Sequence, residues 1–385
     1  MNPEVQKRFQ KAESLSNLEL KLQVVSILSK FIALSFDASF EKLEEGPVVN
    51  TFYFNPAMGS TLNRIQGKEE DIAISLGVES VLIGRELGLV YIQVPRANRK
   101  VIQFHENFFN FIQSKEVLEM TLPLMLGKTT KGEDLYADLA SQPHLLIAGS
   151  TGSGKSIFTS ELICSLALIY PPHELEFILV DTKRLDLVLF SGLPHISSVI
   201  EDIHSLRSTL CELLDEVRLR TAKMSGIARN IKEWNKLGIY DYKYKILIID
   251  EFADVVDTDR EYLSELSPKI RPASIESLLK TLAQISRAAG IHIIIATQRP
   301  SVKVISGDIK TNFPARVAFK LSSMQDSRVI LDENGAEKLL GMGDFLYKIS
   351  GSDTVKRGHS AFVSMKDIAT IISQAEMLRT QYVRR

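Results

Sequence analysis

The feature that most constrains this chain is a glycine-rich run between an apolar stretch and a helix-like one. The run comprises Gly149, Ser150, Thr151, Gly152, Ser153, Gly154, Lys155 and Ser156. Its spacing matches G-x-x-x-x-G-K-[ST], a loop whose backbone N–H groups surround phosphate oxygens. The helix that opens at Lys155 adds its positively polarised N-terminus. We therefore predict a buried strand, a phosphate-binding loop and a helix, in that order.

The residue types in and after this loop predict a nucleoside triphosphate ligand, ATP, with Mg²⁺. Lys155 would contact the β- and γ-phosphates, and the Ser156 hydroxyl would hold the metal. The apolar run Ile246–Ile249 ends in Asp250 and Glu251, 95 residues after Lys155. Asp250 suits Mg²⁺ coordination, and Glu251 suits the general base that polarises the attacking water.

Three further residues lie near another apolar run, Ile291–Ala296. Thr297 and Gln298 follow it and are candidates for sensing the γ-phosphate, although a plain strand exit has the same appearance. Arg287 precedes it at the end of a helical stretch. An arginine there is commonly a partner of the helix dipole. The alternative is an arginine that enters a neighbouring subunit's site, and both interpretations stay open on these residues alone.

Short apolar runs separated by helical stretches predict an α/β fold with a largely parallel sheet and helices on both faces. The expected strands are 145–148, 176–180, 246–249, 291–296 and 315–319. We expect a helical N-terminal segment at 1–40, a small α+β domain at 41–118 and the nucleotide-binding domain at 119–385. Within the small domain we expect strands at 48–54, 81–83 and 89–94 and a helix at 61–76.

Composition argues for a cytoplasmic protein without direct membrane insertion. Hydrophobic residues make up 45% and charged residues 24% of the chain, as in ordinary globular proteins. Cys164 and Cys211 lie in apolar helical surroundings, and we expect both as buried thiols rather than as a disulfide or zinc site. The first residues do not resemble a signal peptide, and the apolar stretch 22–36 is too short and polar to cross a bilayer.

A formal net charge of −1 does not exclude a nucleic-acid partner, because a local patch can attract DNA. Residues 297–330 contain six basic and two acidic residues. A merely solvated face would look the same, so charge alone leaves both interpretations open.

Residues 119–365 resemble the RecA-like motor of the FtsK/SpoIIIE family of double-stranded DNA translocases. The resemblance is carried by the phosphate-binding loop and by several ordered motifs. These are Leu122-Pro123-Leu124, Asp250-Glu251-Phe252-Ala253-Asp254, Arg287-Ala288-Ala289-Gly290-Ile291-His292, Thr297-Gln298-Arg299-Pro300-Ser301, Asp326-Ser327-Arg328 and Leu340-Gly341-Met342-Gly343-Asp344. Residues 41–115 more weakly resemble the family's smaller α domain.

The resemblance implies an ATP-driven homo-oligomeric ring, a hexamer, that threads double-stranded DNA. It assigns Arg287 as the arginine finger and Thr297 as the γ-phosphate sensor. It also assigns DNA-backbone contacts, which carry no sequence information, to Arg299, Lys310 and Arg328. Lys303 stands where the family commonly has Asp, and Met324 stands where it has a DNA-facing Lys. We therefore expect Lys303 to bind DNA as well.

Other departures bear on the biological role. Asp181-Thr182-Lys183 replaces the common Asp-Pro-Lys, and residues 257–274 look like an insertion. The chain shows neither the family's winged-helix module nor its membrane domain, so we expect a plasmid, integrative-element or viral motor at least as much as a septal one. A secretion ATPase that moves polypeptide and an ATP-gated scaffold without hydrolysis are the rival classes. Conjugative transfer and genome packaging are alternative uses of a DNA motor.

Overall fold

A computed structural model of the chain describes residues 3–238, 242–349, 351 and 354–383. These residues form two compact units. The smaller unit contains residues 3–102, 128–133 and 338–340. The larger contains residues 103–127 and 134–337 and those that follow residue 340.

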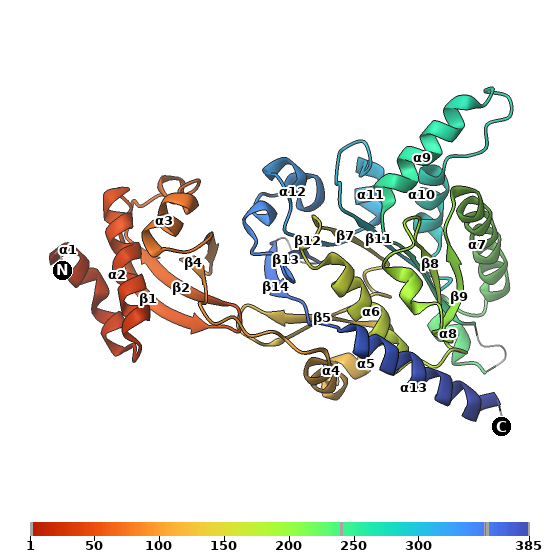
Figure 1. The fold of residues 1–385 in the computed structure, drawn as a ribbon, viewed down its shortest axis with the longest axis horizontal. Coiled ribbons are helices and arrows are strands. Elements are labelled where there is room, and N and C mark those ends of the chain that lie inside the picture. Colours follow the sequence, from red (N-terminus) through yellow and green to blue (C-terminus); the bar gives the residue numbers. More distant parts are fainter. Residues whose placement is uncertain (1–2, 239–241, 350, 352–353, 384–385) are drawn as a thin grey trace. The chain divides into compact units, whose positions relative to one another are not determined.

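The smaller unit is a four-stranded antiparallel sheet covered by helices (Figure 1). The strands run in the order β1-β2-β4-β3 and comprise β1 Ala38–Glu45, β2 Val49–Pro56, β3 Leu82–Glu86 and β4 Leu89–Pro95. The helices are α1 Pro3–Phe9, the 3₁₀ turn Gln10–Ser14, α2 Leu18–Ala33 and α3 Glu69–Leu76. Apolar residues of α2, such as Ile27 and Phe31, share one core with Phe52 and Phe54 of β2. The N-terminal helices therefore belong to the same packed core as this sheet.

In this unit one expectation is wrong in detail and one strand was not expected. The predicted helix 61–76 is instead a 3₁₀ turn at Leu62–Arg64 followed by α3. Gly67, with φ of +77°, interrupts the helical backbone between them, because a left-handed residue cannot continue a right-handed helix. Strand β1 was not predicted, since its charged residues conceal the alternation, and a register shift at Phe40/Lys42 breaks the period.

The larger unit is built on a ten-stranded sheet with the order β6-β5-β14-β13-β12-β7-β11-β10-β8-β9. The strands from β12 to β9 pair in parallel, whereas β13 pairs antiparallel with both β12 and β14. Their bounds are β5 Pro123–Thr129, β6 Asp134–Asp138, β7 His144–Ala148, β8 Leu175–Val180, β9 Ile196–Ile200, β10 Tyr244–Ile249, β11 Ile291–Thr297, β12 Ala315–Phe319, β13 Asp344–Lys348 and β14 Lys356–His359. The predicted fold class is confirmed.

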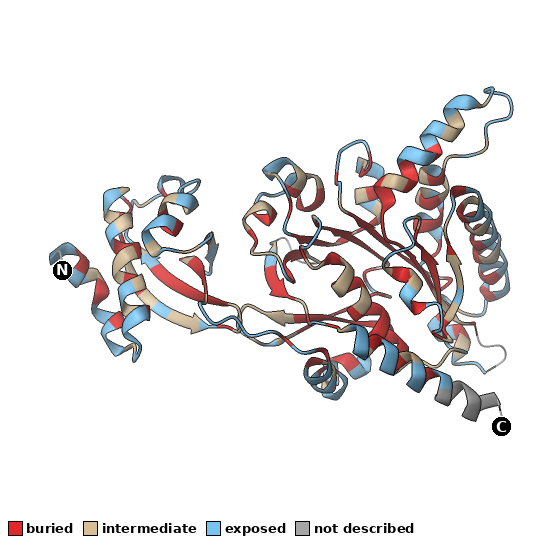
Figure 2. Ribbon diagram, viewed as in Figure 1, coloured by how far each residue is buried: buried red, intermediate tan, exposed pale blue. Residues whose placement is uncertain are grey.

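Helices cover both faces of this sheet (Figure 1). The main ones are α6 Lys155–Ile169, α7 Ile203–Met224, α9 Phe252–Glu265, α10 Ile275–Ile285, α12 Met324–Leu331 and α13 Met365–Val383. Shorter helices are α4 Phe104–Gln113, α5 Lys115–Glu119, α8 Ile231–Asn235 and α11 Gly307–Asn312. Figure 2 shows the central strands as buried, and every residue of β7 and β11 is buried. All five predicted strands are present in this sheet.

The strands that sequence patterns missed include β13 and β14, which carry buried charges. Arg357 Nη2 lies 2.6 Å from Asp344 Oδ2, and both side chains are at most 4% exposed. Charged residues normally indicate a surface position. Because this pair is buried instead, the sequences of β13 and β14 do not show the apolar pattern expected of buried strands. The positive charge of Arg357 outweighs burial and holds the pKa of the Asp344 carboxyl well below its usual range.

The expectation of two buried thiols is half correct. Cys164 is buried in α6, whereas Cys211 is exposed on α7, because α7 turns only one face to the core. Within the part of the chain that the structure describes, no helix combines the length and the apolar character needed to cross a membrane.

Two buried histidines lie side by side at the amino-terminal edge of the large sheet. His144 Nδ1 accepts from the Ile293 N–H at 3.0 Å, so its Nε2 donates to the Ala283 carbonyl at 2.9 Å. His292 Nδ1 donates to the Pro143 carbonyl at 2.9 Å. Burial lowers the pKa of His144 to about 3 and that of His292 to about 4. Both imidazoles are therefore neutral in the folded protein.

These histidines predict a loss of stability in mild acid. Below pH ~6.5 the unfolded chain protonates both imidazoles and the folded chain does not, so the stabilisation present above pH 6.5 declines as the pH falls. These two histidines should lower the free energy of unfolding by about 3 kcal/mol between pH 7.5 and pH 5.5. Urea denaturation at the two pH values measures this, and in a variant in which both histidines are asparagine the difference should shrink by about 3 kcal/mol. The same pH dependence in the unmodified chain and in this variant would contradict the assignment.

Candidate active site

The phosphate-binding loop joins β7 to α6 and is held by close backbone packing. Gly152 and Gly154 have φ of +76° and +110°, a region that favours glycine. A Cβ at Gly154 would lie 2.5 Å from the Gly343 nitrogen. The Gly343 N–H donates to the Ser153 carbonyl at 2.9 Å. The turn at Gly343 therefore supports the loop, which explains why a glycine-containing motif far along the chain accompanies it.

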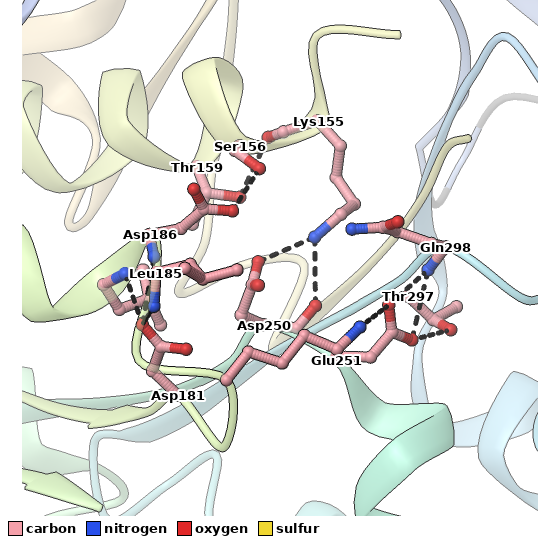
Figure 3. Close-up of polar contacts among 12 residues, drawn as sticks. Lys155, Ser156, Thr159, Asp181, Leu185, Asp186, Asp250, Glu251, Thr297 and Gln298 are labelled. Carbon is pink, nitrogen blue, oxygen red and sulfur yellow. Dashed lines mark hydrogen bonds and ion pairs between the residues drawn. The ribbon is translucent and has the colours of Figure 1, made fainter. Parts of the chain in front are cut away.

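Lys155 and Asp250 form a buried pair at the carboxyl edge of the sheet (Figure 3). Lys155 Nζ donates to Asp250 Oδ1 at 2.7 Å and to the Asp250 carbonyl at 3.0 Å. The two side chains are 3% and 6% exposed. β10 delivers Asp250 to this edge, and β7 delivers the loop that leads to Lys155. The two residues predicted from separate motifs thus meet in the structure.

Glu251 lies beside this pair and is held by the end of β11 (Figure 3). Thr297 Oγ1 donates to Glu251 Oε1 at 2.7 Å, and the Gln298 N–H donates to the same carboxylate at 3.1–3.2 Å. Gln298 Oε1 accepts from Thr151 Oγ1 at 2.8 Å, which links β11 to the phosphate-binding loop. The predicted Glu251, Thr297 and Gln298 therefore form one hydrogen-bonded group next to the loop.

An acid that the sequence analysis did not identify contacts Ser156. The Ser156 hydroxyl donates to Asp186 Oδ2 at 2.6 Å. Asp186 lies in the loop after β8, and Asp181 Oδ2 shapes that loop by accepting the N–H groups of Leu185, Asp186 and Leu187 at 2.9–3.1 Å. The acid in contact with the Ser156 hydroxyl is thus Asp186, while Asp250 contacts Lys155. The sequence did contain one indication of Asp186, because it is an acid that follows closely after a predicted strand of the same parallel sheet.

Lys183 is a second group of this loop that sequence reasoning did not place in the site. Its Nζ lies 2.9 Å from Asp254 Oδ2 and 3.8 Å from Glu251 Oε2. Burial acts to lower the pKa of Lys183, but the hydrogen bond and charge of Asp254 outweigh it and raise that pKa. Asp254 also pairs with Arg299. A positive charge therefore stands next to the expected general base.

The residues present fit a magnesium–nucleotide complex. The buried Ser153 hydroxyl has no hydrogen-bond partner in the described part of the chain, and a Cβ at Gly152 would meet nothing within 4 Å. The loop is thus open beside Gly152, where a phosphate can approach its N–H groups. The oxygen atoms of Ser156, Asp186 and Asp250 are the kind of donor that Mg²⁺ prefers.

Arg287 does not join this group. It lies in the turn between α10 and β11, at the amino-terminal edge of the sheet, whereas the phosphate-binding loop lies at the carboxyl edge. β11 has seven residues and spans about 23 Å at ~3.3 Å per residue. The Arg287 side chain therefore cannot reach the loop of its own chain.

The four predicted DNA contacts fall into two groups in the structure. Arg299 pairs with Asp254, and the Lys303 carbonyl accepts from Arg260 at 2.7 Å, so both lie next to α9. Lys310 pairs with Asp332, and Arg328 Nε donates to Asn334 Oδ1 at 2.7 Å, next to α12. Arg299, Lys303 and Arg328 are exposed.

Comparison with known proteins adds to this geometry. Residues 113–256 match the FtsK/SpoIIIE family and residues 4–96 match the FtsK alpha domain. The chain is 36% identical over 394 residues to the DNA translocase FtsK of Rickettsia prowazekii, covering 92% of this chain and 51% of that protein. It is 34% identical to the DNA translocase FtsK of Pseudomonas aeruginosa, covering 94% and 47%. The chain thus spans about half the length of these relatives.

Solved structures share the fold at lower sequence identity. The pCW3 conjugation coupling protein TcpA, solved as a monomer with ATPγS, has a TM-score of 0.63 at 22% identity and covers 94% of this chain and all of that one. The cytoplasmic domain of the type VII secretion ATPase EccC of Thermomonospora curvata has a TM-score of 0.56 at 23% identity and covers 66% and 31%.

Proposed function

Because the chain belongs to the FtsK/SpoIIIE family, we propose that it is an ATP-dependent motor that moves along double-stranded DNA as a ring of six copies. The observation that carries this proposal is the buried Lys155–Asp250 pair beside Glu251, in a chain about 35% identical to proteins named DNA translocases. Similarity to a secretion ATPase is limited to the fold, so the polypeptide alternative has weaker support. We place the chain in the cytoplasm, because both ATP and duplex DNA are present there.

In this proposal, one copy supplies the phosphate-binding groups and the general base for ATP hydrolysis. Lys155 would leave Asp250 and bind the β- and γ-phosphates in the loop formed by residues 149–156. Glu251 takes a proton from a water molecule whose oxygen attacks the γ-phosphorus. The bond from that phosphorus to the β–γ bridging oxygen breaks, and its electron pair stays on ADP. Thr297 and Gln298, which hold Glu251 in the structure, would exchange this contact for one with the γ-phosphate.

A magnesium ion bound with ATP would neutralise phosphate charge at this site. Ser156 and Asp250 are the predicted holders, and Asp186 joins them because it already contacts the Ser156 hydroxyl. Asp186 would hold the Ser156 hydroxyl in position for the metal.

A ring completes the site. Arg287 lies at the opposite edge of the sheet from its own loop, so in this proposal it contacts ATP held by the neighbouring copy. Arg299, Lys303, Lys310 and Arg328 would face the DNA backbone. Arg299 pairs with Asp254, which also holds Lys183 near Glu251. A DNA phosphate that takes Arg299 from Asp254 would thereby change the charge around the general base.

The test is ATP turnover with and without linear duplex DNA over a salt series. We expect strong stimulation by duplex that declines as salt rises, because each phosphate contact contributes about −0.9 to the slope of log K against log salt. Replacing Lys310 or Arg328 by alanine should reduce that slope by about one each without a change of sequence preference. Turnover that depends on Lys155 but is indifferent to duplex would contradict a DNA motor and favour a polypeptide substrate.

A further inference from the structure

A cleft of about 550 Å³ opens at the amino-terminal edge of the large sheet, away from the phosphate-binding loop. Among the residues that line it are Arg229, Lys232, Arg287 and His292. Arg287 is the expected arginine finger, and Arg229 lines the same cleft.

A backbone hydrogen bond joins the two segments that carry these arginines. The Ile231 N–H donates to the Ala288 carbonyl at 2.9 Å, so the segment that carries Arg229 is bonded to the turn that carries Arg287. A Cβ at Gly290 would lie 2.6 Å from Ile231 Cδ1, which shows how closely the two segments pack.

Further hydrogen bonds hold the segment that carries Arg229 and the turn that carries Arg287. Asn230 Oδ1 accepts the Glu233 N–H at 3.0 Å, and Glu233 Oε2 accepts the Arg229 N–H at 2.9 Å, a reciprocal cap at the start of α8. Beneath the Arg287 turn, the buried Arg220 donates to the Ala289 carbonyl at 2.7 Å. Arg229 takes part in these bonds through its backbone N–H and not through its guanidinium group.

The two guanidinium groups are uncommitted. Arg229 and Arg287 are exposed, and among the described residues neither guanidinium makes a hydrogen bond or an ion pair. Lys232 differs, since its Nζ donates to Thr121 Oγ1 at 2.8 Å. The acid of the cleft, Asp138, already accepts the N–H groups of residues 121, 122 and 140 at 2.8–3.2 Å. Among the described residues, neither guanidinium is therefore held in an ion pair, although the Glu233 carboxylate lies at the backbone N–H of Arg229.

The floor of the cleft carries a polar atom that lacks a partner. His292 is 1% exposed, and its Nε2 is buried without a hydrogen bond in the described part of the chain. Because Nδ1 donates to Pro143, Nε2 is an acceptor. An acceptor nitrogen has no hydrogen to donate to a phosphate oxygen, so an anion in this cleft would bind the arginines rather than His292.

We propose that Arg229 is a second catalytic arginine, which binds with Arg287 to the γ-phosphate of ATP held by Lys155 of the neighbouring copy. This inference rests on the proposed ring. Like Arg287, Arg229 is at the wrong edge of the sheet to reach its own loop. In the proposed ring, the cleft at the amino-terminal edge of each copy's sheet faces the phosphate-binding loop of the next copy.

Two arginines suit the chemistry of this step. Phosphoryl transfer spreads negative charge over the γ-phosphate oxygens and the bridging oxygen, and a guanidinium can contact two such oxygens at once. One arginine can therefore stabilise the leaving bridging oxygen while the other holds the γ-phosphate oxygens. Lysine lacks the planar fork, so Arg229→Lys should restore only part of the activity.

The experiment measures DNA-stimulated ATP turnover of variants alone and in mixed rings. Arg229→Ala alone should lower turnover about 100-fold, the loss typical of one charge-stabilising donor, with nucleotide binding unchanged. A mixture of Arg229→Ala and Lys155→Ala copies should regain activity. The Lys155→Ala copies keep Arg229, which can contact ATP in the intact phosphate-binding loop of a neighbouring Arg229→Ala copy. In a 1:1 mixture about a quarter of the interfaces are complete.

The controls separate this inference from the proposed function. Arg287→Ala mixed with Lys155→Ala tests the ring site itself, and Arg218→Ala, an exposed arginine of α7 paired with Asp215, should leave turnover unchanged. Wild-type turnover in Arg229→Ala overturns the proposal. So does a mixture with Lys155→Ala that stays inactive while the Arg287→Ala mixture recovers. If neither mixture recovers, the inter-subunit site of the proposed function fails, and the role of Arg229 fails with it.

Discussion

Replacement of Lys155 by alanine is expected to abolish ATP turnover, with a loss of at least about 10³-fold. The physical reason is that Lys155 is the only side-chain cation of the phosphate-binding loop, and it is 3% exposed, where charge interactions are strong. Without it, the γ-phosphate loses both an anchor in the ground state and a stabilising charge in the transition state. Phosphate release and the binding of a fluorescent ATP analogue measure the two effects.

This variant needs a control for folding, because Lys155 is the partner of a buried acid. Loss of Lys155 leaves the Asp250 carboxylate without its cation, and breaking such a pair costs about 3–5 kcal/mol. The double variant Lys155→Ala/Asp250→Asn removes the stranded charge and should recover thermal stability while remaining inactive. Lys366→Ala, an exposed lysine of α13, should behave as wild type. Substantial turnover in a folded Lys155→Ala variant would contradict the assigned site.

Replacement of Glu251 by glutamine is expected to separate binding from hydrolysis. Glutamine keeps the size of the side chain and a carbonyl oxygen that can still accept from Thr297 Oγ1, so ATP binding should be unchanged. It cannot accept the proton of the attacking water, and loss of a general base lowers the rate by about 10²–10⁴-fold. Single-turnover hydrolysis of bound ATP measures the step directly.

The matched control is Glu261→Gln, a glutamate of α9 outside the site, which should hydrolyse ATP at the wild-type rate. If Glu251→Gln hydrolyses bound ATP normally, Glu251 is not the base. If it instead fails to bind ATP, the carboxylate serves binding rather than proton transfer.

Much of the ATP site could be predicted from the sequence because its parts follow buried strands. Lys155, Asp250 and Thr297 stand next to continuous apolar runs, and strands of a parallel sheet bring such ends to one edge. Asp186 and Lys183 escaped this reasoning. They lie several residues beyond β8, and only the backbone bonds to Asp181 show that the loop folds back to Ser156 and Glu251.

Other parts of the fold could not be predicted for a related reason. β13 and β14 bury the Asp344–Arg357 pair, so their pattern of charge resembles that of a surface segment. The neighbourhood of Arg229 and Arg287 depends on a hydrogen bond between segments nearly sixty residues apart. No local period encodes a contact of that kind, and it becomes visible only once the sheet is assembled.

The measurement that tests the central claim most directly is displacement of a triplex-forming strand from duplex DNA. A motor that moves along the duplex removes the third strand in a reaction that needs ATP hydrolysis. We predict displacement with ATP, none with a slowly hydrolysed analogue, and none with Lys155→Ala or Glu251→Gln. Duplex-stimulated ATP hydrolysis without any displacement, on DNA long enough to load a ring, would contradict translocation.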